Sequence, residues 1–222
     1  MSALPTLDGP RIEPRGMPAR SLVVFLHGYG ADGNDLIDIG RLWSRHMPAT
    51  AFVSPNAPDP CEESPTGRQW FPLAGVDPAR LRDGVLSAAP TLDAFLDAEL
   101  ARHRLTDDRL VLVGFSQGTM MALQVAPRRA HRIAGVVGYS GLLPGPEYLQ
   151  HEMRQRPPML LVHGDSDPLI PALALFAAQR ILGDNGFAVE WHVRPGLAHA
   201  IDQEGLDLGA AFVQRVLAGH IA

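Results

Sequence analysis

The stretch Leu110-Val111-Leu112-Val113-Gly114-Phe115-Ser116-Gln117-Gly118 decides the fold of this chain. Its four leading apolar residues predict a buried strand, and residues 119–126 after it predict a helix. A strand, a sharp turn and a helix form the setting in which Gly-x-Ser-x-Gly makes a nucleophile elbow, with the serine hydroxyl raised above the sheet edge. The alternative is an ordinary strand-to-helix turn with an incidental serine.

The two glycines and the residue after the serine fit the elbow. Side chains at Gly114 and Gly118 would collide with the neighbouring strand and helix, so glycine is expected there. The backbone N–H of Gln117 would lie at a helix N-terminus and point to where an oxyanion forms. Ser116 is therefore the predicted nucleophile.

Short apolar runs alternate with longer amphipathic stretches along the chain. This alternation predicts an α/β fold, a mainly parallel sheet with helices on both faces. No internal repeat or low-complexity linker interrupts residues 1–222, so we expect a single domain. The predicted strands are residues 21–26, 50–53, 109–113, 132–137, 159–163 and 188–193, and the predicted helices are 31–46, 79–104, 172–182 and 201–217.

Composition narrows the function classes. The chain has 222 residues, 46% of them hydrophobic, which suits one α/β domain with a large core. A net charge of −5 with no basic stripe argues against a nucleic-acid partner. The apolar runs are too short to span a membrane, so no stable membrane insertion is expected. With one cysteine, Cys61, and no signal peptide, the expected location is cytoplasmic.

Residues 54–78 break the alternation. This segment is rich in proline and has no clear periodicity, and loops this long in compact domains are usually functional or disordered. Trp70, Phe71 and Leu73 argue against disorder because they are bulky and apolar. We expect a loop over the active site that forms a wall of the substrate pocket. The alternative is a surface loop tied to the core by its aromatic side chains.

The nucleophile needs a base and an acid. A serine hydroxyl is activated by a histidine that a buried carboxylate orients, and after an elbow the chain order is Ser, acid, His. Two acids compete in the loop after residues 159–163. Asp165 lies where a turn would use its carboxylate to bond nearby backbone amides. Asp167 lies further out, before Pro168, which favours an extended backbone, and is the predicted acid.

His199 is the predicted base. It lies in a Gly-containing loop after the last predicted strand and just before a helix, at the sheet edge where sites of open α/β folds lie. His192 falls within a strand, and His220 is at the C-terminus. His163 precedes the acid and breaks the expected order.

A second oxyanion donor is expected after residues 21–26. The backbone N–H of Tyr29, in the turn His27-Gly28-Tyr29-Gly30, is the candidate beside that of Gln117, whereas His27 is expected to hold the loop. Metal-binding spacings of His, Glu and Cys are missing from the sequence, so no metal is expected. No Gly-x-Gly-x-x-Gly opens a helix, so nucleotide binding has no support.

Five segments together resemble one known family. They are residues 25–32, Pro55-Asn56-Ala57-Pro58 followed by Trp70-Phe71, the elbow, residues 163–171 and residues 196–199. The chain resembles the phospholipase/carboxylesterase family of α/β-hydrolases, which contains acyl-protein thioesterases and small bacterial carboxylesterases. This resemblance covers most of the chain and implies a hydrolase sheet without a large cap domain, activity on carboxylic esters or thioesters, and no cofactor.

The expected function is a serine carboxylester hydrolase acting on short- to medium-chain acyl esters of small molecules, because the chain has no room for a large lid. The alternatives are an acyl-protein thioesterase or lysophospholipase-type deacylase, and a non-catalytic binding protein. A homodimer is also expected, through exposed apolar residues around the pocket loop. The predicted catalytic residues are Ser116, Asp167 and His199, and the predicted substrate-binding residues are Trp70, Phe71, Leu73, Leu142 and Leu169.

Three positions depart from the pattern of the family. Thr119 stands where a second glycine often follows the elbow, and Pro72 stands where an aspartate often follows the Trp-Phe pair. The segment from 57 to 69 is acidic and rich in proline. All three departures are expected near the pocket, where they would change the substrate and leave the chemistry intact.

Overall fold

The computed structural model describes residues 4–73 and 78–221. Seven strands form one sheet in the order β1-β3-β2-β6-β7-β8-β9, and neighbouring strands run parallel except at the β1–β3 edge. The strands are β1 (Arg11–Ile12), β2 (Ser21–Leu26), β3 (Thr50–Val53), β6 (Leu110–Phe115), β7 (Gly135–Tyr139), β8 (Met159–Gly164) and β9 (Val189–Arg194).

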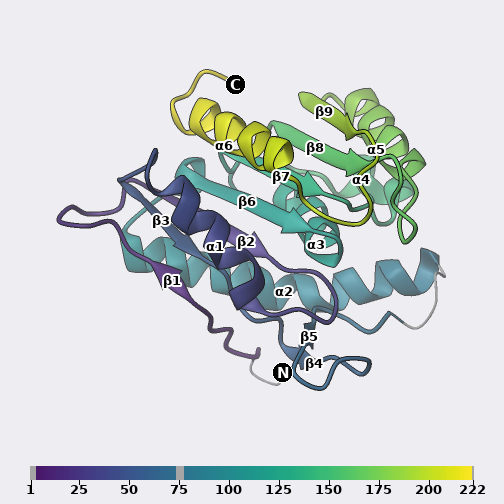
Figure 1. The fold of residues 1–222 in the computed structure, drawn as a ribbon, viewed down its shortest axis with the longest axis horizontal. Coiled ribbons are helices and arrows are strands. Elements are labelled where there is room, and N and C mark those ends of the chain that lie inside the picture. The colour runs from purple at the N-terminus through teal and green to yellow at the C-terminus, as the bar shows by residue number, and fades with distance from the viewer. Residues whose placement is uncertain (1–3, 74–77, 222) are drawn as a thin grey trace.

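Helices cover both faces of this sheet (Figure 1). Apolar side chains alternate along the strands, so each face has its own core cluster, one with α1 and α6 and the other with α2, α3 and α5. The helices are α1 (Gly33–Trp43), α2 (Pro78–His103), α3 (Gln117–Val125), α4 (Leu149–Glu152), α5 (Leu173–Asp184) and α6 (Gln203–Leu217), with short 3₁₀ turns η1 (Asp107–Arg109), η2 (Ala126–Arg128) and η3 (Pro146–Tyr148).

The predicted fold class is confirmed. The strands β2 and β3 begin and end at the predicted residues, and the predicted helices differ from the observed ones only at their ends. The predicted strand at 132–137 lies later, at 135–139, and extends to the residue before Ser140. The described residues include no large cap domain over the sheet.

One buried arginine joins α2 to the end of α3. Arg129 follows η2 and pairs with Asp93 and Asp97 on α2 and with Asp107 on η1, while only 5% of its own side chain is exposed. A buried guanidinium needs such partners because it cannot lose its proton. The network therefore fixes the helix layer beneath the elbow.

The segment at 54–78 is more ordered than the sequence suggests. It contains an antiparallel pair, β4 (Asp59–Pro60) with β5 (Arg68–Gln69), and Arg68 bridges to Ala31 in the loop after β2. Residues 74–77 of the predicted loop lie outside the described residues. In the part of the chain that is described, no helix is both long and apolar enough to cross a membrane.

Candidate active site

The elbow at Ser116 has a backbone conformation that L-residues seldom adopt. Ser116 lies between β6 and α3 with φ 53° and ψ −116°, and its N–H donates to Tyr139 O at 2.9 Å. A Cβ on Gly118 would lie 1.8 Å from Leu26 O, and one on Gly114 would lie 2.5 Å from Gly118 O. The prediction that both glycines allow close approach is confirmed, and the approach forces the sharp turn that exposes the serine.

His199 and Asp167 meet beside this turn. His199 Nδ1 donates to Asp167 Oδ2 at 2.7 Å, which leaves Nε2 of the ring free of that proton. The ring of His199 packs on that of Phe115, the residue before the serine, with centroids 4.9 Å apart. The structure therefore brings the three predicted catalytic residues to the carboxyl ends of β6, β8 and β9.

Asp167 accepts three hydrogen bonds and has a second histidine nearby. Its Oδ1 accepts from the N–H groups of Leu169 and Ile170 at 2.9 and 3.0 Å, and its Oδ2 lies 3.2 Å from His163 Nε2 as well as 2.7 Å from His199 Nδ1. Burial opposes ionisation of this carboxyl, but the bonds from Ile170, His199 and Leu169 outweigh it and lower the pKa of Asp167 below 3.8. Asp167 is therefore an anion at neutral pH.

His163 supports the loop that carries Asp167, a role that the sequence analysis did not assign to it. Its Nε2 donates to Ile170 O at 2.8 Å, since a carbonyl oxygen can only accept, and lies 3.2 Å from Asp167 Oδ2. It holds the acid loop from inside the fold, and its ring is buried. The spacing of His163 and Asp167, four residues apart across a tight loop, is the one signal that could have suggested this contact.

Asp165 ties the acid loop to the histidine loop. Its Oδ1 accepts from Gly196 N at 2.7 Å and from Ser166 Oγ at 2.9 Å. The predicted structural role for Asp165 thus extends to an amide 31 residues away. This bond fixes the loop that carries His199 relative to the loop that carries Asp167.

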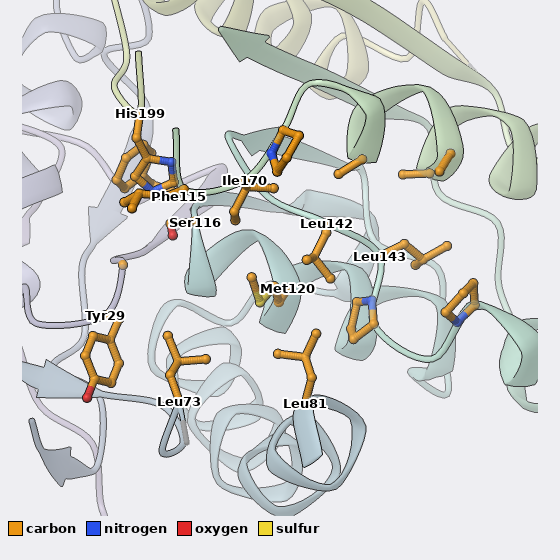
Figure 2. Close-up of a pocket in the computed structure, with 18 of the residues that line it drawn as sticks. Tyr29, Leu73, Leu81, Phe115, Ser116, Met120, Leu142, Leu143, Ile170 and His199 are labelled. Carbon is orange, nitrogen blue, oxygen red and sulfur yellow. The ribbon is translucent and has the colours of Figure 1, made fainter. Parts of the chain in front are cut away.

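The two predicted oxyanion donors, the N–H groups of Gln117 and Tyr29, belong to segments that adjoin Ser116. Gln117 is the first residue of α3, so its N–H has no acceptor within the helix. The loop of Tyr29 lies against the nucleophile, since a Cβ on Gly28 would be 3.3 Å from Ser116 Cβ. The Tyr29 hydroxyl points away from Ser116 (Figure 2), and a hydrogen bond with Cys61 raises its pKa to about 12.

His27 holds this loop, as predicted. Its Nδ1 donates to Gly28 O at 2.8 Å, and its Nε2 accepts from Ala57 N at 3.0 Å. Burial lowers the pKa of His27, which keeps the ring neutral and Nε2 an acceptor. A neutral His27 therefore connects the oxyanion loop to the proline-rich segment.

A cavity of about 650 Å³ opens beside Ser116 and His199 (Figure 2). Its lining is almost wholly apolar and comes from the loops after β2 and β7, from α2 and α3, and from the start and inner face of α5. The predicted binding residues Leu73, Leu142 and Leu169 line this cavity, together with Leu143, Met120 and Ile170. An apolar cavity that begins at a serine and a histidine can take an acyl chain.

Trp70 and Phe71 do not line this cavity, and the expectation that they form its wall is corrected. Their side chains are 1% and 2% exposed and belong to the core. Trp70 Nε1 donates to His27 O at 3.0 Å, and the Gln117 side chain accepts from Trp70 N and donates to Phe71 O. The aromatic pair therefore anchors the segment to the elbow, which is the alternative considered above.

Thr119 also lies away from the cavity, contrary to expectation. Its hydroxyl donates to Tyr139 O at 2.8 Å. Its methyl group lies where Cβ atoms on Gly138 and Gly141 would stand, 2.7 and 2.5 Å away. Glycine at those two positions makes room for the threonine behind the sheet edge.

Among the described residues, no group of three His, Cys, Asp or Glu side chains could hold a metal ion.

Comparisons with known proteins agree with this geometry. Residues 7–217 match the family described as Phospholipase/Carboxylesterase. The crystal structure of esterase PE8 is 41% identical in sequence and has a TM-score of 0.93, and the match covers 96% of this chain and 100% of that one. Acyl-protein thioesterase 1 of Schizosaccharomyces pombe is 30% identical over 88% of this chain and 90% of its own length. Its namesake in Saccharomyces cerevisiae is 27% identical over 95% and 99%.

The fold, the elbow and these similarities define a serine hydrolase of the esterase class. Within that class, the chain belongs to the phospholipase/carboxylesterase family. The resemblance drawn from the five sequence segments is thereby confirmed.

Proposed function

We propose that this enzyme hydrolyses carboxylic esters through the triad Ser116, His199 and Asp167 and an acyl-enzyme intermediate. The observation that carries the proposal is the 2.7 Å bond from His199 Nδ1 to Asp167 Oδ2, with Ser116 and His199 on the same apolar cavity. This bond presents the unprotonated Nε2 of His199 as the base for the Ser116 hydroxyl.

In the proposed mechanism, Ser116 Oγ attacks the acyl carbon while His199 takes its proton. The imidazolium that forms is stabilised by the anionic Asp167. The negative charge on the acyl oxygen is held by the N–H groups of Tyr29 and Gln117. His199 then gives its proton to the departing alcohol, and water, deprotonated by His199, releases the acid.

The apolar cavity supports acyl chains of medium length. Each methylene that leaves water gains about 0.8 kcal/mol, or roughly a fourfold rise in kcat/KM while the chain still fits. The 650 Å³ volume sets the limit, because a longer chain must leave part of its length in water. We therefore propose a preference that peaks between the short and the long ends of an ester series.

Hydrolysis of p-nitrophenyl esters from acetate to palmitate by wild type and Ser116→Ala tests the proposal. The variant should lose at least about a thousandfold in kcat while its unfolding temperature is kept, because the hydroxyl is the nucleophile. Full turnover by pure Ser116→Ala would contradict the mechanism. No turnover by wild type on any ester would favour a binding protein.

Thioester hydrolysis is the second candidate. It is favoured by the two yeast relatives, which carry the name acyl-protein thioesterase 1. The same cavity and triad would serve it, since only the leaving atom differs. An acyl-thioester of the same chain length, measured beside the oxygen ester and corrected for its intrinsic reactivity, separates the two candidates.

We also propose a cytoplasmic location, on the grounds given in the sequence analysis.

A further inference from the structure

A second cavity lies on the other side of the oxyanion loop. It has a volume of about 350 Å³, within the range of roughly 300–1,000 Å³ found for ligand cavities. It lies between α1 and the start of α6, and its lining is mainly apolar. The lining residues that differ from those of the first cavity are His27, Asp35, Leu36, Ile39, Ile201 and Leu206.

The two cavities meet at the reaction centre. Gly28, Ala31 and Phe115 line both of them. Gly28 is the residue that approaches Ser116 Cβ, and the Phe115 ring packs on His199. A substrate bound at Ser116 can therefore extend in two directions, one on each side of these shared residues.

The chemistry assigns the two directions. An ester has an acyl part and an alcohol part joined at the reacting carbon, and His199 must give its proton to the alcohol oxygen. That oxygen therefore lies on the His199 side of the acyl carbon. Phe115, whose ring packs on that of His199, and Ile201, two residues after His199, both line the second cavity, so an alcohol part can extend into it from this oxygen while the acyl chain occupies the first cavity.

We propose that the second cavity binds the alcohol part of the substrate, as a neutral apolar alkyl or aryl group. This inference rests on the proposed function and names the leaving group that the function left open. Apolar side chains of Leu36, Ile39 and Leu206 would cover such a group. The exposed carboxylate of Asp35, at the edge of the cavity, disfavours an anionic alcohol part.

The test compares hexyl butyrate with methyl butyrate. Both esters give the same butyryl-enzyme and release alcohols of similar acidity, so a difference in kcat/KM reports how the alcohol part is bound during acylation. Leu206→Trp fills the second cavity and should lower the hexyl-to-methyl ratio of kcat/KM by about fivefold or more. Leu206→Ala enlarges the cavity and should raise the kcat/KM of the bulkier benzyl butyrate relative to that of methyl butyrate.

Two control variants separate the cavities. Ala211→Trp places the same side chain on the exposed face of α6 and should leave the ratio at its wild-type value. Ala178→Leu narrows the first cavity and should change the dependence on acyl length, with the hexyl-to-methyl ratio unaltered. Loss of activity on every ester by wild type would overturn the proposed function itself. An active enzyme whose ratio is unchanged in both Leu206 variants would overturn only the assignment of the second cavity.

Discussion

Asp167 is the residue on which the proposed site depends most. It orients His199, it accepts hydrogen bonds from two backbone N–H groups, and its Oδ2 lies 3.2 Å from His163 Nε2. These bonds favour the ionised carboxylate over the neutral acid, so they contribute to folding stability as well as to the orientation of His199. Stability and activity therefore respond together to the charge of this side chain.

The first prediction concerns the pH dependence of stability. The folded-state pKa of Asp167 lies below 3.8, its unfolded value, so its contribution is fully present above pH 3.8 and is lost as the pH falls through the folded pKa. Asp167→Asn removes that contribution. Wild type should be the more stable at pH 7, and the difference in unfolding free energy should shrink below about pH 4. Denaturant unfolding at several pH values in this range measures the difference between the two proteins. A difference that stays constant with pH would contradict a lowered pKa of Asp167.

His163 should act as a positioning residue. His163→Leu removes the donor to Ile170 O, which leaves that buried carbonyl unpaired at a cost of roughly 1–3 kcal/mol, and it also removes the Nε2 atom that lies 3.2 Å from Asp167 Oδ2. Because the polar ring that faces Oδ2 is replaced by an apolar side chain, the pKa of Asp167 should rise. The acid-induced loss of stability should then begin at a higher pH than in wild type. If stability is lowered but the acid-induced loss begins at the same pH as in wild type, His163 has only a packing role.

At the scale of elements, the side chain of Gln117 joins two distant parts of the chain. It leaves the first turn of α3 and completes the backbone hydrogen bonds of Trp70 and Phe71, 47 and 46 residues away. The helix that presents Ser116 therefore also holds the segment that begins at Ser54. Displacement of that segment would disturb the elbow.

Gln117→Leu should release this segment. The variant keeps a side chain of similar size but leaves the Trp70 N–H and the Phe71 carbonyl unpaired, at roughly 1–3 kcal/mol each. Limited proteolysis should cut residues 54–73 at least about tenfold faster than in wild type. Gln214→Leu, on the exposed face of α6, is the matched control and should keep the wild-type rate. Equal cleavage of both variants would contradict the anchoring role.

The sequence predicts those elements whose signal is local. The strands β2 and β3 are apolar runs that end at sharp polar or proline boundaries, and the elbow combines two glycines with a strand and a helix. The residues Asp167 and His199 follow from chain order and loop position. The burial of Trp70 and Phe71 could not be predicted, because an aromatic pair in an aperiodic segment can face a core or a pocket equally well. Only the bonds to Gln117 and His27, set by tertiary structure, decide between them.

At the scale of the whole molecule, an exposed apolar face lies on α5 and β9, whereas the sequence predicts one around the pocket loop. The pocket-loop aromatics are buried, whereas Leu173 and Phe176 on α5 and Trp191 on the edge strand β9 are exposed. There Phe176 and Trp191 form an edge-to-face pair with centroids 5.4 Å apart, and Leu173 is 75% exposed. Self-association remains a prediction, and this face is the one we now expect it to use.

Sedimentation at increasing protein concentration tests that expectation. Wild type should show a monomer–dimer equilibrium, and Trp191→Arg should shift it towards the monomer, because a charge replaces an apolar contact. Leu42→Arg changes an exposed apolar side chain on α1 and serves as the control that should still dimerise. Wild type that sediments as a monomer at every concentration would contradict the prediction of a homodimer.

The backbone at Ser116 has a practical consequence for laboratory evolution. With φ at 53° and ψ at −116°, this position suits glycine better than any residue with a side chain. A screen that selects only for heat resistance would therefore reward Ser116→Gly, a variant that has no nucleophile. Improved variants of this enzyme should be sought by screening heat resistance and turnover in the same round, since stability and activity favour different residues at this position.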